Sequence, residues 1–151
     1  MTRPAPGYRS KTLATWLALL GGSFGLHRFY LNGLRDAWGW LHPPLAVLGL
    51  YGVQRVHEFG QDDHLSWVLI PLLGSILAGS MLMAIVYGLT SDEAWNARHN
   101  PAGRASRSGW AAVIGAALAL LIGAGVLMAT IAFSGQRFFE YQMEQARGLG
   151  R

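Results

Sequence analysis

The chain has 151 residues, 52% of them hydrophobic and only 13% charged, with a mean hydropathy of +0.27, which is too apolar for the surface of an ordinary water-soluble domain and indicates a membrane protein. Its formal net charge of +4 comes from basic residues scattered in short groups, so no basic stripe could follow a phosphate backbone and nucleic acid is excluded as a partner. The absence of cysteine excludes disulfides, thiolate catalysis and lipid attachment through cysteine.

Residues 1–11 hold three basic residues among prolines and a glycine, and we expect them to form a basic cytoplasmic arm, because Lys and Arg beside a span resist translocation. The uncharged run at 12–26 has fifteen residues. At ~1.5 Å per residue it covers about 22 Å of a hydrocarbon core that is about 30 Å thick, so it cannot cross upright unaided. A secretory signal peptide begins in the same way, but the direct continuation into a second apolar run favours a helix that is retained.

The second run, 37–54, has no formally charged residue but contains His42, Pro43 and Pro44. The prolines lack amide donors and disfavour helix before them, which predicts a kink or break. An ionisable side chain at membrane depth is a candidate functional residue, so His42 has two interpretations. It could belong to a polar path, or, as we favour, a neutral imidazole could bond to a carbonyl that the prolines leave free.

A glycine-rich segment, 21–33, includes the end of the first run and leads towards the second, and it carries one cluster of basic and aromatic residues. It predicts that 12–54 forms a tight helical hairpin with its bend at the membrane surface. Arg28 could bind a lipid phosphate, but we favour a clamp in which it pairs with Asp36 or a carbonyl. His27 could respond to pH, although a tolerated polar residue is the simpler interpretation. The candidate hinge residues are Gly21, Gly22, Gly25, His27, Arg28, Phe29, Tyr30 and Gly33.

Two longer uncharged runs follow, 65–91 with 27 residues and 109–136 with 28. Each exceeds the ~20 residues that cross a bilayer, which predicts a third and a fourth span. The polar segments 55–64 and 92–108 are then loops. We expect Ser91 to cap a short helix that ends near Asn100, and 137–151 to form a juxtamembrane tail that extends the last helix along the interface.

The first loop has side chains that could bind a divalent metal, but their spacing matches no ligand motif, so we expect a solvated loop and no metal site. These side chains are His57, Glu58, Asp62, Asp63 and His64. The last span instead carries small residues at every fourth position, a pattern typical of helix packing in lipid. They are Ala111, Gly115, Ala119 and Gly123.

Four crossings would put both termini on one side. Counting Lys and Arg gives seven on the side of the termini and five on the other, a weak bias that predicts cytoplasmic termini.

About a third of the chain, residues 9–54, resembles the TM-two domain family of small membrane proteins, in which two helices are joined by a short turn carrying Asp- or His-Arg-Phe. Two features depart from the family pattern: Asn32 stands where glycine is usual, and the two prolines interrupt the second helix. The resemblance implies an integral membrane location and, for bacterial members, no settled activity. The residues that carry it are Lys11, Gly21, Gly22, Gly25, 27–31 and Gly33.

The sequence therefore predicts an all-α integral membrane protein of the bacterial inner membrane, with four transmembrane helices of which the first two form a short glycine-hinged hairpin. We expect a structural or interaction protein, a scaffold or accessory subunit, that is no enzyme and needs no cofactor or small-molecule substrate. Its expected partners are the lipid bilayer and either copies of itself or another membrane protein. The alternative is a transport or pore component that uses a broken second helix around His42.

Overall fold

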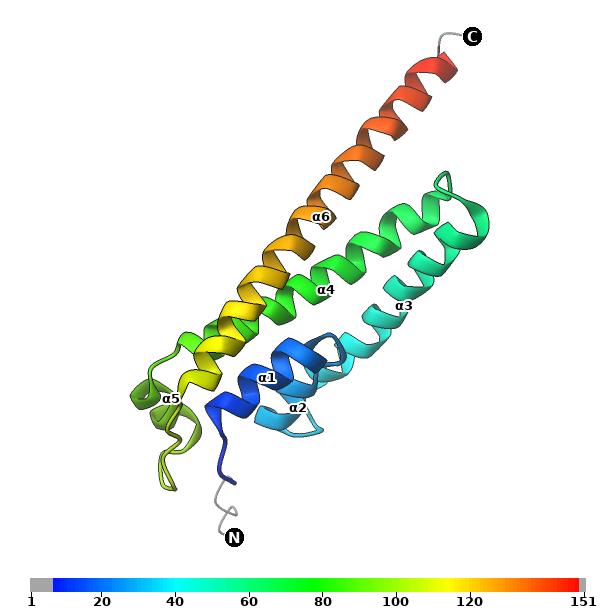
Figure 1. The fold of residues 1–151 in the computed structure, drawn as a ribbon. Coiled ribbons are helices and arrows are strands. Elements are labelled where there is room, and N and C mark those ends of the chain that lie inside the picture. Colours follow the sequence, from blue (N-terminus) through cyan, green and yellow to red (C-terminus); the bar gives the residue numbers. More distant parts are fainter. Residues whose placement is uncertain (1–6, 150–151) are drawn as a thin grey trace.

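The structure is a computed structural model that describes residues 7–149, and Figure 1 shows that this part of the chain is built from helices alone. The predicted all-α fold is confirmed. The first six residues of the basic arm and the last two of the tail lie outside the described residues. The elements are α1 (Lys11–Gly21), a 3₁₀ turn η1 (Gly22–Phe24), α2 (Leu26–Asn32), α3 (Ala37–Phe59), α4 (His64–Leu89), α5 (Asp92–His99) and α6 (Trp110–Leu149).

Short polar side chains start four of the helices. Ser10, Asp36, Asp63 and Ser91 precede α1, α3, α4 and α5, and the side chain of each accepts a hydrogen bond from a backbone N–H in the first turn. Such caps satisfy donors that have no partner within the helix. The cap predicted at Ser91 is confirmed, and α5 ends at His99, next to the expected Asn100.

The first helix does not cross the bundle. With 11 residues, α1 extends only about 16 Å. It ends beside the middle of α4, where a Cβ on Gly22 would lie 2.5 Å from Cβ of Ser80. The chain then turns at Gly25 and runs back along α1, so that the Tyr30 hydroxyl accepts a hydrogen bond of 2.7 Å from the Ser10 N–H. The helices α1 and α2 thus form a short hairpin that enters the bundle and returns.

The sequence predicts one bend between two helices, but the structure has two turns with the short helix α2 between them. The chain turns once at η1 and Gly25 and again at 33–36, and only then begins α3. The reason is local: Gly25 has φ of 76° and Gly33 has φ of 82°, a backbone region that glycine occupies without strain. Two such turns lie only eight residues apart, and they leave room for just the seven residues of α2 between them.

The helix α3 continues through Pro43 and Pro44, so the expected break at 42–44 is not present. Proline 43 removes the helical hydrogen bond to the Gly39 carbonyl. That carbonyl faces Gly25, where a Cβ would lie only 2.5 Å from its oxygen. Further along, Gly52 of α3 lies against α4, since a Cβ there would come within 2.5 Å of Leu69 Cβ. The helix α3 packs against these neighbours and is continuous across the two prolines, so the predicted break is absent.

The distribution of side chains in the bundle is the reverse of that in a water-soluble protein. The buried apolar residues are mainly small, whereas many Leu, Ile, Val and Met side chains are exposed; Leu121 is 73% and Met128 67% exposed. In water such side chains would be the first to be buried. An exposed surface of large apolar groups over a core of small ones fits a lipid environment, where small residues allow helices to approach closely. The buried alanines are Ala14, Ala18, Ala46, Ala84, Ala112, Ala116 and Ala119.

By length and composition, α4 and α6 could each cross a membrane. Exposed aromatic side chains lie near both ends of the bundle, as expected where helices leave the lipid. Trp38 and Trp110 are 66% and 81% exposed at the starts of α3 and α6, and Phe59 and Phe139 are each 63% exposed towards the other end. The composition, the reversed core and these aromatic residues all point to a membrane protein.

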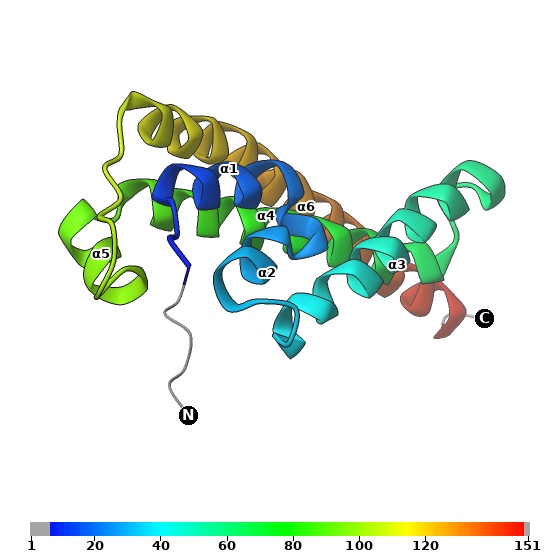
Figure 2. The same ribbon diagram turned by 90° about the horizontal axis from the view of Figure 1, so that it is seen from below.

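The first and last described residues lie at opposite ends of the bundle, as Figure 1 shows. We call these the N-terminal end, where residues 7–11, the 33–36 turn and the 90–109 segment gather, and the C-terminal end, with the 60–63 turn and the last part of α6. The helices α3, α4 and α6 connect the two ends: α3 leads away from the N-terminal end, α4 returns and α6 leads away again (Figures 1 and 2). This arrangement does not support the expectation that both termini lie on one side.

Candidate functional site

The basic and aromatic residues of the predicted motif, 27–30, lie on α2, which packs against α1, η1 and α3. His27 is 1% exposed, and its ring centroid lies 5.7 Å from that of His42 and 6.0 Å from that of Tyr87. Within the described chain, its Nδ1 has no hydrogen-bond partner. The Nδ1 of His42 lies 2.8 Å from the Trp38 carbonyl. Because a carbonyl only accepts, His42 donates from Nδ1. The Trp38 carbonyl is not one of those that Pro43 and Pro44 leave without a helical donor, so the predicted bond to a freed carbonyl is not formed.

Arg28 holds the second turn closed. Its Nε donates to Asp36 Oδ2 over 2.9 Å and its terminal nitrogen donates to Oδ1 over 3.3 Å, which is the clamp favoured from the sequence. Asn32 donates to the same carboxylate over 2.7 Å, and Asp36 also accepts from the Trp38 N–H at the start of α3. The hydrogen bond from Asn32, together with that from Arg28, lowers the pKa of Asp36 to about 2. One carboxylate therefore joins α2 to α3.

The two aromatic residues of the motif make separate contacts. The Phe29 ring lies 5.1 Å from the ring of Trp40, between centroids. The hydroxyl of Tyr30 binds the Ser10 backbone, and its ring lies 5.2 Å below the guanidinium of Arg9. Phe29 therefore fixes α2 to α3, while Tyr30 fixes it to the start of α1.

The motif glycines allow close packing or special turns. Gly21 and Gly22 are buried, and Gly25 combines a positive φ with the Gly39 carbonyl close by. Gly33 has a positive φ of 82° but nothing within 4 Å of the position of a Cβ. Gly33 is thus needed only for its backbone conformation, whereas Gly25 is needed for space as well.

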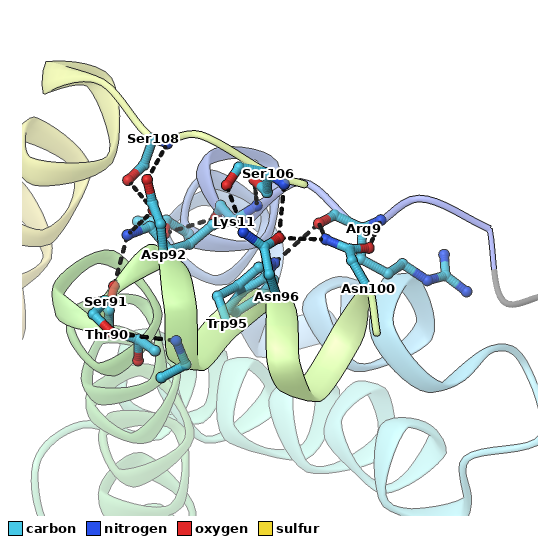
Figure 3. A network of polar contacts seen from close by, with 12 residues as sticks. Arg9, Lys11, Thr90, Ser91, Asp92, Trp95, Asn96, Asn100, Ser106 and Ser108 are labelled. Carbon is cyan, nitrogen blue, oxygen red and sulfur yellow. Dashed lines mark hydrogen bonds and ion pairs between the residues drawn. The ribbon is translucent and has the colours of Figure 1, made fainter. Parts of the chain in front are cut away.

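A network of polar contacts at the N-terminal end, shown in Figure 3, is centred on Lys11. This residue is 4% exposed, and its Nζ donates to the Thr90 carbonyl over 2.6 Å and pairs with Asp92 Oδ1 at 2.8 Å. Asp92 also accepts from the N–H and the hydroxyl of Ser108 over 3.0 and 2.5 Å. The hydrogen bond from Lys11, followed by those from Ser108, lowers the pKa of Asp92 to about 2. A buried cation is thereby neutralised where α1, α4 and α5 meet.

The same network holds the backbone before α1 (Figure 3). Indole Nε1 of Trp95 and the amide of Asn100 donate to the Arg9 carbonyl over 2.9 and 3.0 Å, while the Arg9 N–H donates to Asn100 Oδ1 over 2.9 Å. The Lys11 N–H donates to the hydroxyl of Ser106 over 3.1 Å. The sequence does not predict this site, since Lys11 ends the expected basic arm and Asp92 lies in an expected polar loop, although Lys11 is among the residues that carry the family resemblance. The cap at Ser91 was the only signal that the loop carries structure.

The small residues predicted to pack on the last span contact this same chain. Gly115, Ala119 and Gly123 are buried, whereas Ala111 is exposed, with its carbonyl accepting from Trp16. A Cβ on Gly115 would lie 3.0 Å from Thr15 of α1, and one on Gly123 would lie 2.7 Å from Met81 of α4. This face of α6 is therefore occupied inside one molecule.

The C-terminal end has its own ion pairs. Arg55 and Asp63 form two hydrogen bonds, of 2.8 and 2.6 Å, which close the turn between α3 and α4. Arg137 is 8% exposed, binds Glu140, and has its guanidinium about equally close to the rings of Trp67 and Phe133. Among residues 7–149 no three His, Cys, Asp or Glu side chains are grouped as a metal would require.

Acid should weaken the fold through two of these carboxylates. Asp36 and Asp92 both have a folded-state pKa of about 2, below the usual 3.8, so their contribution to the free energy of unfolding is complete above pH ~4. It is lost as pH falls from about 4 to 2. We expect the melting temperature in detergent to fall below pH 4 through these carboxylates, in addition to the loss that the lowered pKa of His99 causes as pH falls below 6.5.

Replacing both carboxylates, as Asp36→Asn with Asp92→Asn, should lower stability at pH 7 and flatten this acid dependence. Glu93→Gln is the matched control, because Glu93 is exposed and forms no ion pair among the described residues. An acid slope equally steep in the double variant and in wild type would show that these ion pairs do not contribute as inferred.

Comparison with known proteins locates a family within the chain. Residues 7–55 match the family model described as the TM2 domain, and these residues contain α1, α2 and most of α3. The match covers the motif, the Arg28–Asp36 clamp and the cap of α1. Neither a curated protein nor a solved structure matched the chain. The N-terminal third of this chain therefore matches the TM2 domain, which confirms the predicted resemblance to the TM-two domain family over residues 7–55.

Proposed function

We propose that this protein is a scaffold or accessory subunit of the bacterial plasma membrane, with no catalysis of its own, that associates with a second copy of itself through the lipid-facing side of α4 and α6. The observation that carries the proposal is a groove of about 450 Å³ between these two helices. It is lined by small and aliphatic residues, including Ser75, Gly79, Leu82 and Ala124.

Small residues on a lipid-facing surface favour the approach of another helix, since packing and not burial from water drives association in a bilayer. Within this chain Gly79 is not used for packing: no atom lies within 4 Å of the position of its Cβ. This distinguishes it from Gly115 and Gly123, whose contacts are inside the molecule. The groove is thus an apolar surface of small residues that is free to receive a helix.

Gly79→Leu should abolish self-association by filling the groove, without disturbing the fold. Gly125→Leu is the matched control, since Gly125 also has open space around its Cβ but does not line the groove. The measurement is energy transfer between donor- and acceptor-labelled copies in liposomes as the protein-to-lipid ratio is varied. Transfer lost in Gly79→Leu and kept in Gly125→Leu supports the proposal.

Equal transfer in both variants contradicts a role for the groove. If neither wild type nor either variant shows energy transfer, the groove between α4 and α6 does not bind a second copy of this chain. A different membrane protein would then have to be sought by crosslinking from position 79.

For the topology, we infer three crossings, by α3, α4 and α6, with α1 and α2 entering and leaving on the same side. The charges support this. Ten basic residues of the described chain divide seven to three between the ends. The N-terminal end has Arg9, Lys11, Arg28, Arg35, Arg98, Arg104 and Arg107, and the C-terminal end has Arg55, Arg137 and Arg147.

The acidic residues divide in the opposite sense, three at the N-terminal end and five at the C-terminal end. Since Lys and Arg stay on the cytoplasmic side, the N-terminal end is cytoplasmic and the C-terminal end faces the outside. The division of basic residues, seven to three, is a stronger bias than the seven to five that four crossings would give. The acidic residues are Asp36, Asp92 and Glu93 at the first end, and Glu58, Asp62, Asp63, Glu140 and Glu144 at the second.

A further inference from the structure

Two adjoining cavities lie at the N-terminal end, beside the TM2 motif. One, of about 260 Å³, lies between α2, α4 and α5, and the other, of about 340 Å³, extends from it towards Arg9. They are continuous, because four residues line both: Leu31, Asn32, Arg98 and His99. Each is near the lower end of the ~300–1,000 Å³ of small-molecule sites, which suits a headgroup better than a whole lipid.

The walls of these cavities are positively charged. Three arginines are among the residues that line them, Arg9, Arg28 and Arg98, and no Asp or Glu of the described chain is. Asp36 occupies only Nε and one terminal nitrogen of Arg28, and Arg98 forms no ion pair with residues 7–149. After burial, the nearby charges of Arg98 and Arg9 are what lower the pKa of His99. The cavity therefore has an excess of positive charge.

The floor of the first cavity is apolar. Met83 and Val86 line it from α4, below Thr90 and the start of α5. In Figures 1 and 2 α5 lies beyond the end of α4. Arg98, a residue of α5, is therefore at the end of the bundle where α4 leaves the bilayer in the inferred topology. A positively charged rim above aliphatic side chains matches a phosphate above acyl chains, and guanidinium groups bind phosphate oxygens in pairs.

We propose that this cavity binds the phosphate of an anionic phospholipid headgroup, held by Arg28, Arg98 and Arg9, with the upper acyl carbons against Met83 and Val86. The same phosphate chemistry could be supplied by a water-soluble phosphate ester. Basic pockets between membrane helices are suited to anionic headgroups because they add specific hydrogen bonds to the attraction between opposite charges. Asn32, which lines both cavities, offers a further polar contact at the rim.

The test uses the full chain in a neutral detergent, with lipid binding measured by native mass spectrometry. Phosphatidylglycerol, phosphatidylcholine and glycerol 3-phosphate are titrated separately. Arg98→Gln should weaken phosphatidylglycerol binding roughly ten-fold, the effect of losing one charge-assisted hydrogen bond. Arg107→Gln is the matched control, because Arg107 is an exposed arginine at the same end that lines neither cavity.

A second variant, Ala94→Phe, fills the first cavity without changing the charge and should also weaken binding, at an unchanged melting temperature. Equal phosphatidylglycerol affinity in Arg98→Gln and Arg107→Gln would overturn the proposal, because binding would then depend on overall charge. Binding of glycerol 3-phosphate as tight as that of phosphatidylglycerol would overturn the assignment to lipid in favour of a soluble phosphate ester. The proposal is supported if wild type binds phosphatidylglycerol more tightly than phosphatidylcholine and if this preference is lost in Arg98→Gln and Ala94→Phe but kept in Arg107→Gln.

Discussion

Gly25→Ala is expected to destabilise the protein by roughly 2–5 kcal/mol, from about 1–2 kcal/mol of backbone strain and about 1–3 kcal/mol of overpacking. The strain arises because Gly25 has φ of 76°. The overpacking arises because the new Cβ would lie 2.5 Å from the Gly39 oxygen and 3.2 Å from its carbonyl carbon. Backbone atoms cannot rotate away as a side chain can, so α3 would have to move off the α1–α2 hairpin.

Gly33→Ala separates these two causes. Gly33 has φ of 82° and ψ of 175°, a backbone region that is essentially reserved for glycine, but it has open space around its Cβ, so the variant should cost only backbone strain, about 1–3 kcal/mol. Unfolding of both variants in mixed micelles with increasing dodecyl sulfate, followed by circular dichroism, gives the free energies. A loss in Gly25→Ala no larger than the αL strain alone, about 1–2 kcal/mol, would contradict the close contact between the Gly25 turn and α3.

Asp92→Asn is expected to cost about 2–4 kcal/mol, because it leaves the buried charge of Lys11 without a carboxylate. Lys11 Nζ would keep the Thr90 carbonyl at 2.6 Å but would face a neutral amide in place of the carboxylate, in a position where its side chain is 5% exposed. Asp92 itself is 31% exposed, so water would replace part of the lost interaction and the effect stays below that of a fully buried pair.

Two further variants test the cause of this loss. Lys11→Met combined with Asp92→Asn removes the unpaired charge and should recover part of the stability. Glu144→Gln breaks an exposed pair with His64, whose side chain is 60% exposed, and should cost below ~1 kcal/mol. If Asp92→Asn and Glu144→Gln had equal effects on dodecyl sulfate unfolding, the network at the N-terminal end would not anchor α1.

Local patterns in the sequence predicted much of this fold. Uniform apolar runs identify α4 and most of α6, and the cap at Ser91 lies immediately before the helix that it starts. Arg28 and Asp36 lie eight residues apart across one turn, so their pairing could be expected from chain geometry. The last helix continues to Leu149, past the end of its apolar run at 136, so the predicted extension of this helix into the tail is confirmed.

Other features depend on contacts between distant parts of the chain. Lys11 binds a carbonyl 79 positions away, and no local pattern identifies that partner. The 11 residues of α1 and the seven of α2 are too short to be recognised by periodicity alone, and α1 is fixed by α4 and by the 106–108 segment. The continuity of α3 through Pro43 likewise results from tertiary packing that outweighs a local penalty.

The central claim is that α3, α4 and α6 cross a bilayer while the α1–α2 hairpin does not, and the sidedness of the two chain ends tests it most directly. The chain has no cysteine, so Tyr8→Cys and Gly148→Cys each introduce a single reactive thiol, at exposed positions near opposite ends. Bacterial spheroplasts that contain either variant are treated with a membrane-impermeant maleimide. We predict that position 148 reacts in intact spheroplasts and position 8 only after permeabilisation. Reaction of both positions, or of neither, before permeabilisation would contradict three crossings.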